Sequence, residues 1–246
     1  MTDRRDIIRR LSLAGLAAAA VLSTTPGARA NTFSFVTPAA AEIGGEAVSV
    51  TAIFVLSDGQ LQITVSNHEA NPNDDAQALN AITFQVDEGS LASVGLGSSS
   101  MVTMVEKSGT YSFPVPISPT QWELQTNTGA HSTTFSVCDL CVGGKPQQLL
   151  IGPPDLSSNT YLGNGIASIF QHNPNLFETA LFTLSSPKLT PALSISHVIF
   201  GFGTGSDTAQ GALIPPPASA PEPATMPLFA AGAVLLGLVG YRRRTR

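Results

Sequence analysis

The stretch that decides the fold is residues 47–65, AVSVTAIFVLSDGQLQITV, in which two apolar runs flank a turn signal. Residues 47–56 are rich in β-branched side chains, residues 57–60 contain an Asp-Gly pair, and residues 61–65 alternate with a period of two. An Asp-Gly pair between two such runs is a strong short-range signal of a β-hairpin. This stretch therefore predicts two antiparallel strands joined by a tight turn.

Similar short runs continue along the chain, separated by turn residues. The further strand candidates are residues 79–86, 102–105, 111–115, 121–124, 133–137, 148–151, 166–170, 176–184 and 193–202. Between the two ends no segment keeps the 3.6-residue apolar period of a helix, and residues 75–80 offer one turn at most. We therefore expect an all-β fold, an antiparallel β-sandwich of about 8–10 strands.

The amino-terminal residues have the pattern of an export signal. An apolar run over residues 11–22 follows a basic region and precedes Ala28-Arg29-Ala30, whose small residues are typical of a signal peptidase site. The basic residues are Arg4, Arg5, Arg9 and Arg10. We expect a signal helix in residues 1–30 and cleavage after Ala30. The arginine pair is also similar to a twin-arginine signal, so Sec and twin-arginine export both stay open.

The carboxyl-terminal end has three ordered parts. Pro221-Glu222-Pro223 precedes an apolar run over residues 226–241, and a cluster of arginines follows it. At about 16 residues, the run is shorter than the ~20 that cross a bilayer comfortably. The cluster would stay on the cytoplasmic side and set the topology of the segment. It consists of Arg242, Arg243, Arg244 and Arg246.

This three-part tail resembles the PEP-CTERM sorting tail that exosortases recognise in exopolysaccharide-producing Gram-negative bacteria. The resemblance implies a precursor held transiently in the inner membrane, processing at Pro221, Glu222 and Pro223, and delivery to the cell surface or extracellular matrix. Two body segments, residues 65–84 and 195–204, also look like segments of uncharacterised PEP-CTERM proteins with β-rich bodies. No activity comes with that second resemblance.

The chain then divides into five parts. They are a signal peptide (1–30), the β-domain (31–213), a Pro-rich spacer (214–223), a transmembrane helix (224–241) and a basic tail (242–246). Between residues 31 and 220 there are three lysines, no arginine and 14 acidic residues, a formal charge of −11. Proteins bind nucleic acids and anionic lipids through clustered cations. The acidic composition of residues 31–220 therefore excludes nucleic-acid binding.

Cys138 and Cys141 are the two cysteines of the chain. In an exported protein such a pair indicates a disulfide, here one that closes a very short loop and adds little stability. A zinc site would need two further ligands from His68, His131, His172 and His197, and a redox motif would need a following helix. The local disulfide is our preferred interpretation, with metal binding and redox chemistry as the alternatives.

Asp74 and Asp75 lie in a polar loop whose oxygen atoms suit Ca²⁺, but the loop lacks the ligand order of an EF-hand. The alternative is that these carboxylates begin the turn before residue 79. We therefore assign no metal and no cofactor to the chain, and keep Asp74 and Asp75 as weak calcium candidates.

The sequence predicts no catalytic residues, because it contains no nucleophile elbow and no facing carboxylate pair. We expect a structural or interaction protein rather than an enzyme, with an exosortase, signal peptidase and exopolysaccharide as partners. A carbohydrate-binding module is the alternative if Trp122 and either Tyr111 or Tyr161 form an exposed platform. A hydrolase or metalloenzyme would require a cleft that joins Cys138 and Cys141 with two histidines.

Overall fold

The computed structural model describes residues 30–88, 91, 94–113, 121–139, 141, 147–162 and 166–215. The signal sequence before Ala30, the predicted membrane segment, the Pro-Glu-Pro motif and the arginine cluster lie outside these residues. The strands are β1 (Asn31–Val36), β2 (Glu42–Ile43), β3 (Glu46–Ala47), β4 (Val50–Ser57), β5 (Gln60–Asn67), β6 (Leu79–Val86), β7 (Gly95–Val105), β8 (Tyr111–Ser112), β9 (Glu123–Thr128), β10 (Thr133–Cys138), β11 (Leu150–Ile151), β12 (Asn175–Ser185), β13 (Ile195–Phe202), β14 (Asp207–Gln210) and β15 (Ala212–Ile214). The helical elements are the 3₁₀ turn η1 (Asp75–Gln77) and the short helix α2 (Ile166–Phe170).

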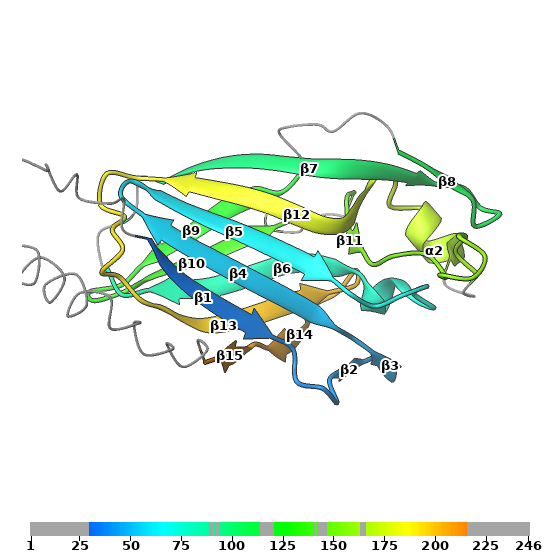
Figure 1. Ribbon diagram of the computed structural model, residues 1–246, viewed down its shortest axis with the longest axis horizontal. Coiled ribbons are helices and arrows are strands. Elements are labelled where there is room, and N and C mark those ends of the chain that lie inside the picture. The colour runs from blue at the N-terminus through cyan, green and yellow to red at the C-terminus, as the bar shows by residue number, and fades with distance from the viewer. Residues whose placement is uncertain are drawn as a thin grey trace, which may run out of the picture.

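Thirteen of the strands form one hydrogen-bonded sheet that is folded into two facing layers (Figure 1). One layer runs in the order β7-β12-β5-β4-β1-β15, and the other in the order β9-β10-β6-β13-β14. The short strand β11 joins them, because Leu150 pairs with Leu79 of β6 and also with Leu176 of β12. The β11–β12 pairing is parallel, so the sheet is mixed rather than wholly antiparallel.

Residues 207–214 make a second connection between the layers. Their first half, β14, pairs with β13, and their second half, β15, pairs with β1. Gly211 lies between the halves and donates its backbone N–H to the carbonyl of Val198 at 2.8 Å. A Cβ atom at Gly211 would lie 3.1 Å from the ring of Phe200 and 3.2 Å from a methyl of Val198. The absence of a side chain therefore lets this segment lie close against β13.

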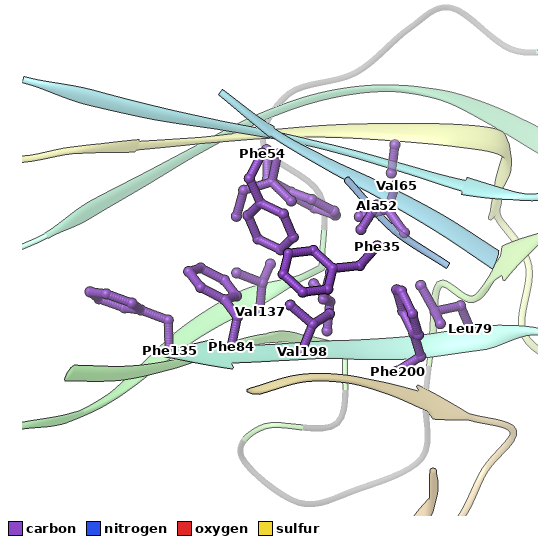
Figure 2. Close-up of a cluster of buried hydrophobic side chains, with 14 of the residues drawn as sticks. Phe35, Ala52, Phe54, Val65, Leu79, Phe84, Phe135, Val137, Val198 and Phe200 are labelled. Atoms are coloured by element: carbon purple, nitrogen blue, oxygen red, sulfur yellow. The ribbon is translucent and has the colours of Figure 1, made fainter. Parts of the chain in front are cut away.

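The core fills the space between the layers, as the alternating sequence requires. In β4 every second residue is buried, and β5, its neighbour in the same layer, has the same pattern. Four phenylalanines make consecutive ring contacts through the core, with centroids 5.7, 4.9 and 5.5 Å apart (Figure 2). They are Phe35, Phe54, Phe84 and Phe135. Aromatic contacts of this kind add to the stability that burial provides.

The first and last described strands lie side by side and leave from the same end of the sheet. Asn31 at the start of β1 pairs with Leu56 near the β4–β5 turn, and β15 runs antiparallel to β1 so that Ile214 lies opposite Ser34. The opposite end carries α2, β8, β2 and β3 (Figure 1). We call this opposite end the distal end. Within the described residues no helix is long and apolar enough to cross a membrane.

The predominantly β fold confirms the sequence-based prediction, but three details differ. The described chain contains 15 strands rather than 8–10, because short strands such as β2 and β3 lack a sequence pattern of their own. Residues 166–170 form α2 rather than a strand, since a five-residue apolar run fits either element. Strand β15 extends to Ile214, the first residue of the predicted spacer.

Candidate functional site at the distal end

Two buried amide side chains organise the loop that joins the layers between β5 and β6. Asn67 donates from Nδ2 to the carbonyls of Gln77 at 2.9 Å and Leu150 at 3.0 Å, and its Oδ1 accepts from the backbone N–H of Glu69. Gln77 donates from Nε2 to the carbonyl of Ala47 at 2.9 Å. Because Asn67 and Gln77 are 1% and 3% exposed, these bonds satisfy groups that would be costly to bury unpaired. The loop is therefore held by its interior.

A third buried amide, Asn80, connects this region to β13. Its Nδ2 donates to the carbonyls of Phe202 at 3.0 Å and Gly203 at 2.8 Å. Strands β6 and β13 also pair along most of their length. The two body segments that resemble those of other PEP-CTERM proteins, residues 65–84 and 195–204, thus lie together. The amides that these segments contribute, Asn67, Gln77 and Asn80, stabilise the fold through their hydrogen bonds to the backbone.

Sequence reasoning missed these amides, although a signal was present. Asn67 continues the inward alternation of Leu61, Ile63 and Val65, and Asn80 occupies the inward position two residues before Ile82. A polar residue at an inward position of a strand indicates a buried side chain with specific hydrogen-bond partners.

The carboxylate of Asp74 caps η1. Its Oδ1 accepts the backbone N–H of Ala76 at 2.9 Å, while the side chain of Gln77 binds back to the cap, which completes a capping box. This geometry favours the turn-forming interpretation of Asp74 over calcium binding. Among the described residues, no group of three or more His, Cys, Asp or Glu side chains is arranged to hold a metal ion.

Asp75 and His172 connect η1 to the segment after α2. The Oδ2 of Asp75 lies 3.9 Å from the Nε2 of His172, and the two side chains are 21% and 10% exposed. Burial, together with the hydrogen bond and the negative charge of Asp74, raises the pKa of Asp75 to about 6, and the charge of His172 opposes this shift. Burial also raises the pKa of Asp139, against hydrogen bonds from the Gln148 and Gln147 backbone and the charge of His172. The distal end thus places a histidine within electrostatic reach of two partly buried carboxyls.

We expect Asp75→Asn to stabilise the protein at neutral pH. The folded state binds the Asp75 proton more tightly than the unfolded state, so this carboxyl lowers stability as pH rises from about 4 through about 6. The variant should gain about 1 kcal/mol at pH 7.5, a value reduced for solvent screening and for the lost contact with His172. Below pH 4 the two proteins should unfold alike.

Urea unfolding at pH 3.5, 5 and 7.5 measures this difference. Glu123→Gln, which neutralises an exposed carboxylate on β9, serves as the control. A gain from Asp75→Asn that is equally large at pH 3.5 would contradict the assignment.

Cys138 and Cys141 are joined by a disulfide in the structure, with Cα atoms 5.3 Å apart. The bridge closes the turn at the end of β10 and lies against β9, because Gln125 donates from Nε2 to the carbonyl of Cys141. Asp139, between the cysteines, accepts the backbone N–H of Gln148 through Oδ2 at 2.7 Å. With both sulfurs bonded to each other, this form offers no thiolate to a metal.

The aromatic residues considered for sugar binding are not arranged as one exposed platform. Trp122 is 3% exposed, donates from Nε1 to the carbonyl of Gln148 at 2.8 Å and packs on Phe182. Tyr161 is 1% exposed, and its hydroxyl donates to the carbonyl of Gly152. Tyr111 is partly exposed and meets Tyr161 edge to face.

The four histidines are held in separate environments. His68 shares a hydrogen bond with Thr51, His172 approaches Asp75, and His197 contacts Ser196. His131 is exposed in the turn between β9 and β10. His197 has a positive φ of 49° where the β13–β6 register shifts. The structure therefore does not bring the cysteine pair and two histidines into one cleft formed by described residues.

In the sequence, the described β-rich body is followed by a proline-rich segment, an apolar run and a cluster of arginines, which is the order of parts expected of a carboxyl-terminal sorting signal. The family model of the PEP-CTERM protein-sorting motif matches residues 219–244, so the chain carries this sorting motif. The motif indicates an exported, exosortase-targeted protein whose precursor is anchored in the membrane by its carboxyl-terminal end. No curated protein matches the chain.

Proposed function

We propose that the body is a structural or interaction module that an exopolysaccharide-producing Gram-negative bacterium delivers to its cell surface or extracellular matrix. In this proposal a signal peptidase removes residues 1–30, the tail holds the precursor in the inner membrane, and an exosortase cleaves near Pro221-Glu222-Pro223. The match of the sorting motif to residues 219–244 is the single observation that carries the proposal.

The positions of the two ends of the described body support this role. Asn31 follows the predicted cleavage site, and Ile214 lies seven residues before Pro221; both are on the paired strands β1 and β15. An anchored precursor would therefore hold the sheet by the end that carries both termini. The distal end, with η1, α2 and β8, would then face away from the membrane and be available to partners.

We propose binding rather than catalysis as the activity of the body. The polar side chains that converge at the distal end, Asn67, Gln77 and Asn80, make their bonds to the protein backbone. Such amides hold loops in place, which is a structural role. The burial of Trp122 and Tyr161 counts against the carbohydrate-binding alternative, since stacking on a sugar requires an exposed ring.

An epitope fused after Arg246 tests the sorting proposal. In a host with the exosortase, the epitope should be shed and the body should leave the membrane fraction. In a host without it, epitope and body should remain joined in the membrane, because the apolar run and the arginines that follow still anchor the chain.

Replacing Glu222 with alanine in the host that has the enzyme should leave the epitope attached. Ser219→Ala, two residues before the Pro-Glu-Pro motif, is the matched control and should be processed like the unmodified chain. An epitope that remains attached in both hosts would mean a permanent tail anchor and would remove the basis for matrix delivery.

A further inference from the structure

One lateral side of the two-layered sheet ends in two strands with open outer edges. Strand β9 pairs with β10 on one side, and among the described residues no strand pairs with its other side. Strand β7 pairs with β12 along its length and with β8 only at Met104 and Val105. Strands β7 and β9 are neighbours in space. An open strand edge presents backbone N–H and C=O groups that another strand can pair with.

Strand β9 lacks the features by which proteins usually protect an edge. Its sequence, ELQTNT, contains no proline, glycine or lysine, and its register with β10 continues without a bulge over six pairs. Thr126 and Thr128 are exposed although their partners on β10, Phe135 and Thr133, are fully buried. Strand β9 therefore projects beyond the layer that covers β10.

The charge of β9 also differs from that of its surroundings. The body carries a formal charge of −11, yet residues 124–128 are uncharged and Glu123 is the single acidic residue of the strand. Two copies of this body repel each other over most of their surfaces. At β9 they can approach with little repulsion.

We propose that β9 pairs antiparallel with β9 of a second copy of this chain, which extends the layer β9-β10-β6-β13-β14 of each body across a two-fold axis. Residues of an antiparallel pair lie directly opposite each other, so the axis passes through a residue, and Gln125 and Thr126 are the two residues at the middle of β9. In the first register Glu123 faces Asn127 of the other copy, and in the second it faces Gly129. Neither register opposes two acidic side chains, so a second copy can pair with β9 without repulsion between carboxylates.

Sedimentation velocity of the full-length chain in detergent tests this pairing. We expect a concentration-dependent dimer that becomes tighter as NaCl is raised from about 0.05 to about 0.5 M, since salt screens the repulsion between acidic bodies. Thr126→Lys places like charges beside each other near the axis and should raise the dimer Kd at least tenfold, on the order of 1.4 kcal/mol. Gln62→Lys adds the same charge on the exposed face of β5, which has a partner on both sides, and should leave the dimer intact.

A charge exchange distinguishes pairing from a loss of folding. Thr126→Glu should also weaken self-association, and an equimolar mixture of the Thr126→Lys and Thr126→Glu proteins should form the mixed dimer. A wild-type chain that stays monomeric, a dimer unaffected by Thr126→Lys, or equal weakening by Gln62→Lys would overturn the proposal. The pairing involves the body alone, so its failure would leave the sorting experiment unaffected.

Discussion

Replacing Phe84 with alanine is expected to lower the free energy of unfolding by about 3–5 kcal/mol, the range for deleting a large buried aromatic side chain. Phe84 is fully buried at the centre of β6, and its ring contacts Phe54 in the facing layer and Phe135 on the neighbouring strand. Removing the ring leaves a cavity that rigid strands on both sides cannot close. It also breaks the series of aromatic contacts at its middle.

Urea unfolding followed by the fluorescence of Trp122 measures the effect, because this tryptophan is buried against Phe182 and reports on the core. Leu213→Ala is the matched control: this side chain on β15 is 53% exposed, and its loss should cost less than about 1 kcal/mol. A Phe84→Ala protein with near wild-type stability would mean that the two layers are not packed through this residue.

The second large effect is expected from Gly152→Ala, which should destabilise the protein by about 3 kcal/mol through overpacking. A Cβ atom at this position would lie 2.0 Å from the carbonyl oxygen of Glu69, a backbone atom that no side-chain rotation can move. The neighbouring chain is fixed as well, because the N–H of Asn71 donates to the carbonyl of Pro153 at 2.7 Å. The substitution must therefore separate the segment after β11 from the loop after β5.

Gly95→Ala is the control for this prediction, since the structure leaves open space around a Cβ at Gly95 and the position lies in β7. Thermal unfolding of both variants gives the comparison. Equal melting temperatures for Gly152→Ala and Gly95→Ala would show that the loop after β5 does not approach β11 as closely as described.

The elements that follow local pattern could be predicted from the sequence. The hairpin around Asp58-Gly59 forms as β4 and β5, with Gly59 at a φ of +79°, and residues 79–86 match β6. In these strands the inward positions are apolar apart from Asn67 and Asn80 near the strand ends, so the period of two is clear. A turn that begins at Asp74 was also among the sequence-based alternatives, because the capping of η1 depends only on neighbouring residues.

What could not be predicted depends on contacts between distant parts of the chain. Strand β15 has three residues, all exposed, and is a strand because β1, about 180 residues earlier, pairs with it. The approach of His172 to Asp75 and Asp139 likewise results from the folding of the sheet, and no spacing in the sequence indicates it. The buried amides were detectable as polar residues at inward positions, but their backbone partners were not.

The pairing of β15 with β1 has a mechanical consequence for a body that is held by its tail and bound by a partner at the distal end. A pulling force between these two points would act along the axis of β15. Its three pairs with β1, from Ser34–Ile214 to Val36–Ala212, would then carry the load together in shear. Peeling would instead load them one at a time. A pair of strands resists shear better than peeling. Tension on the anchored body would therefore be resisted in the stronger of these two directions.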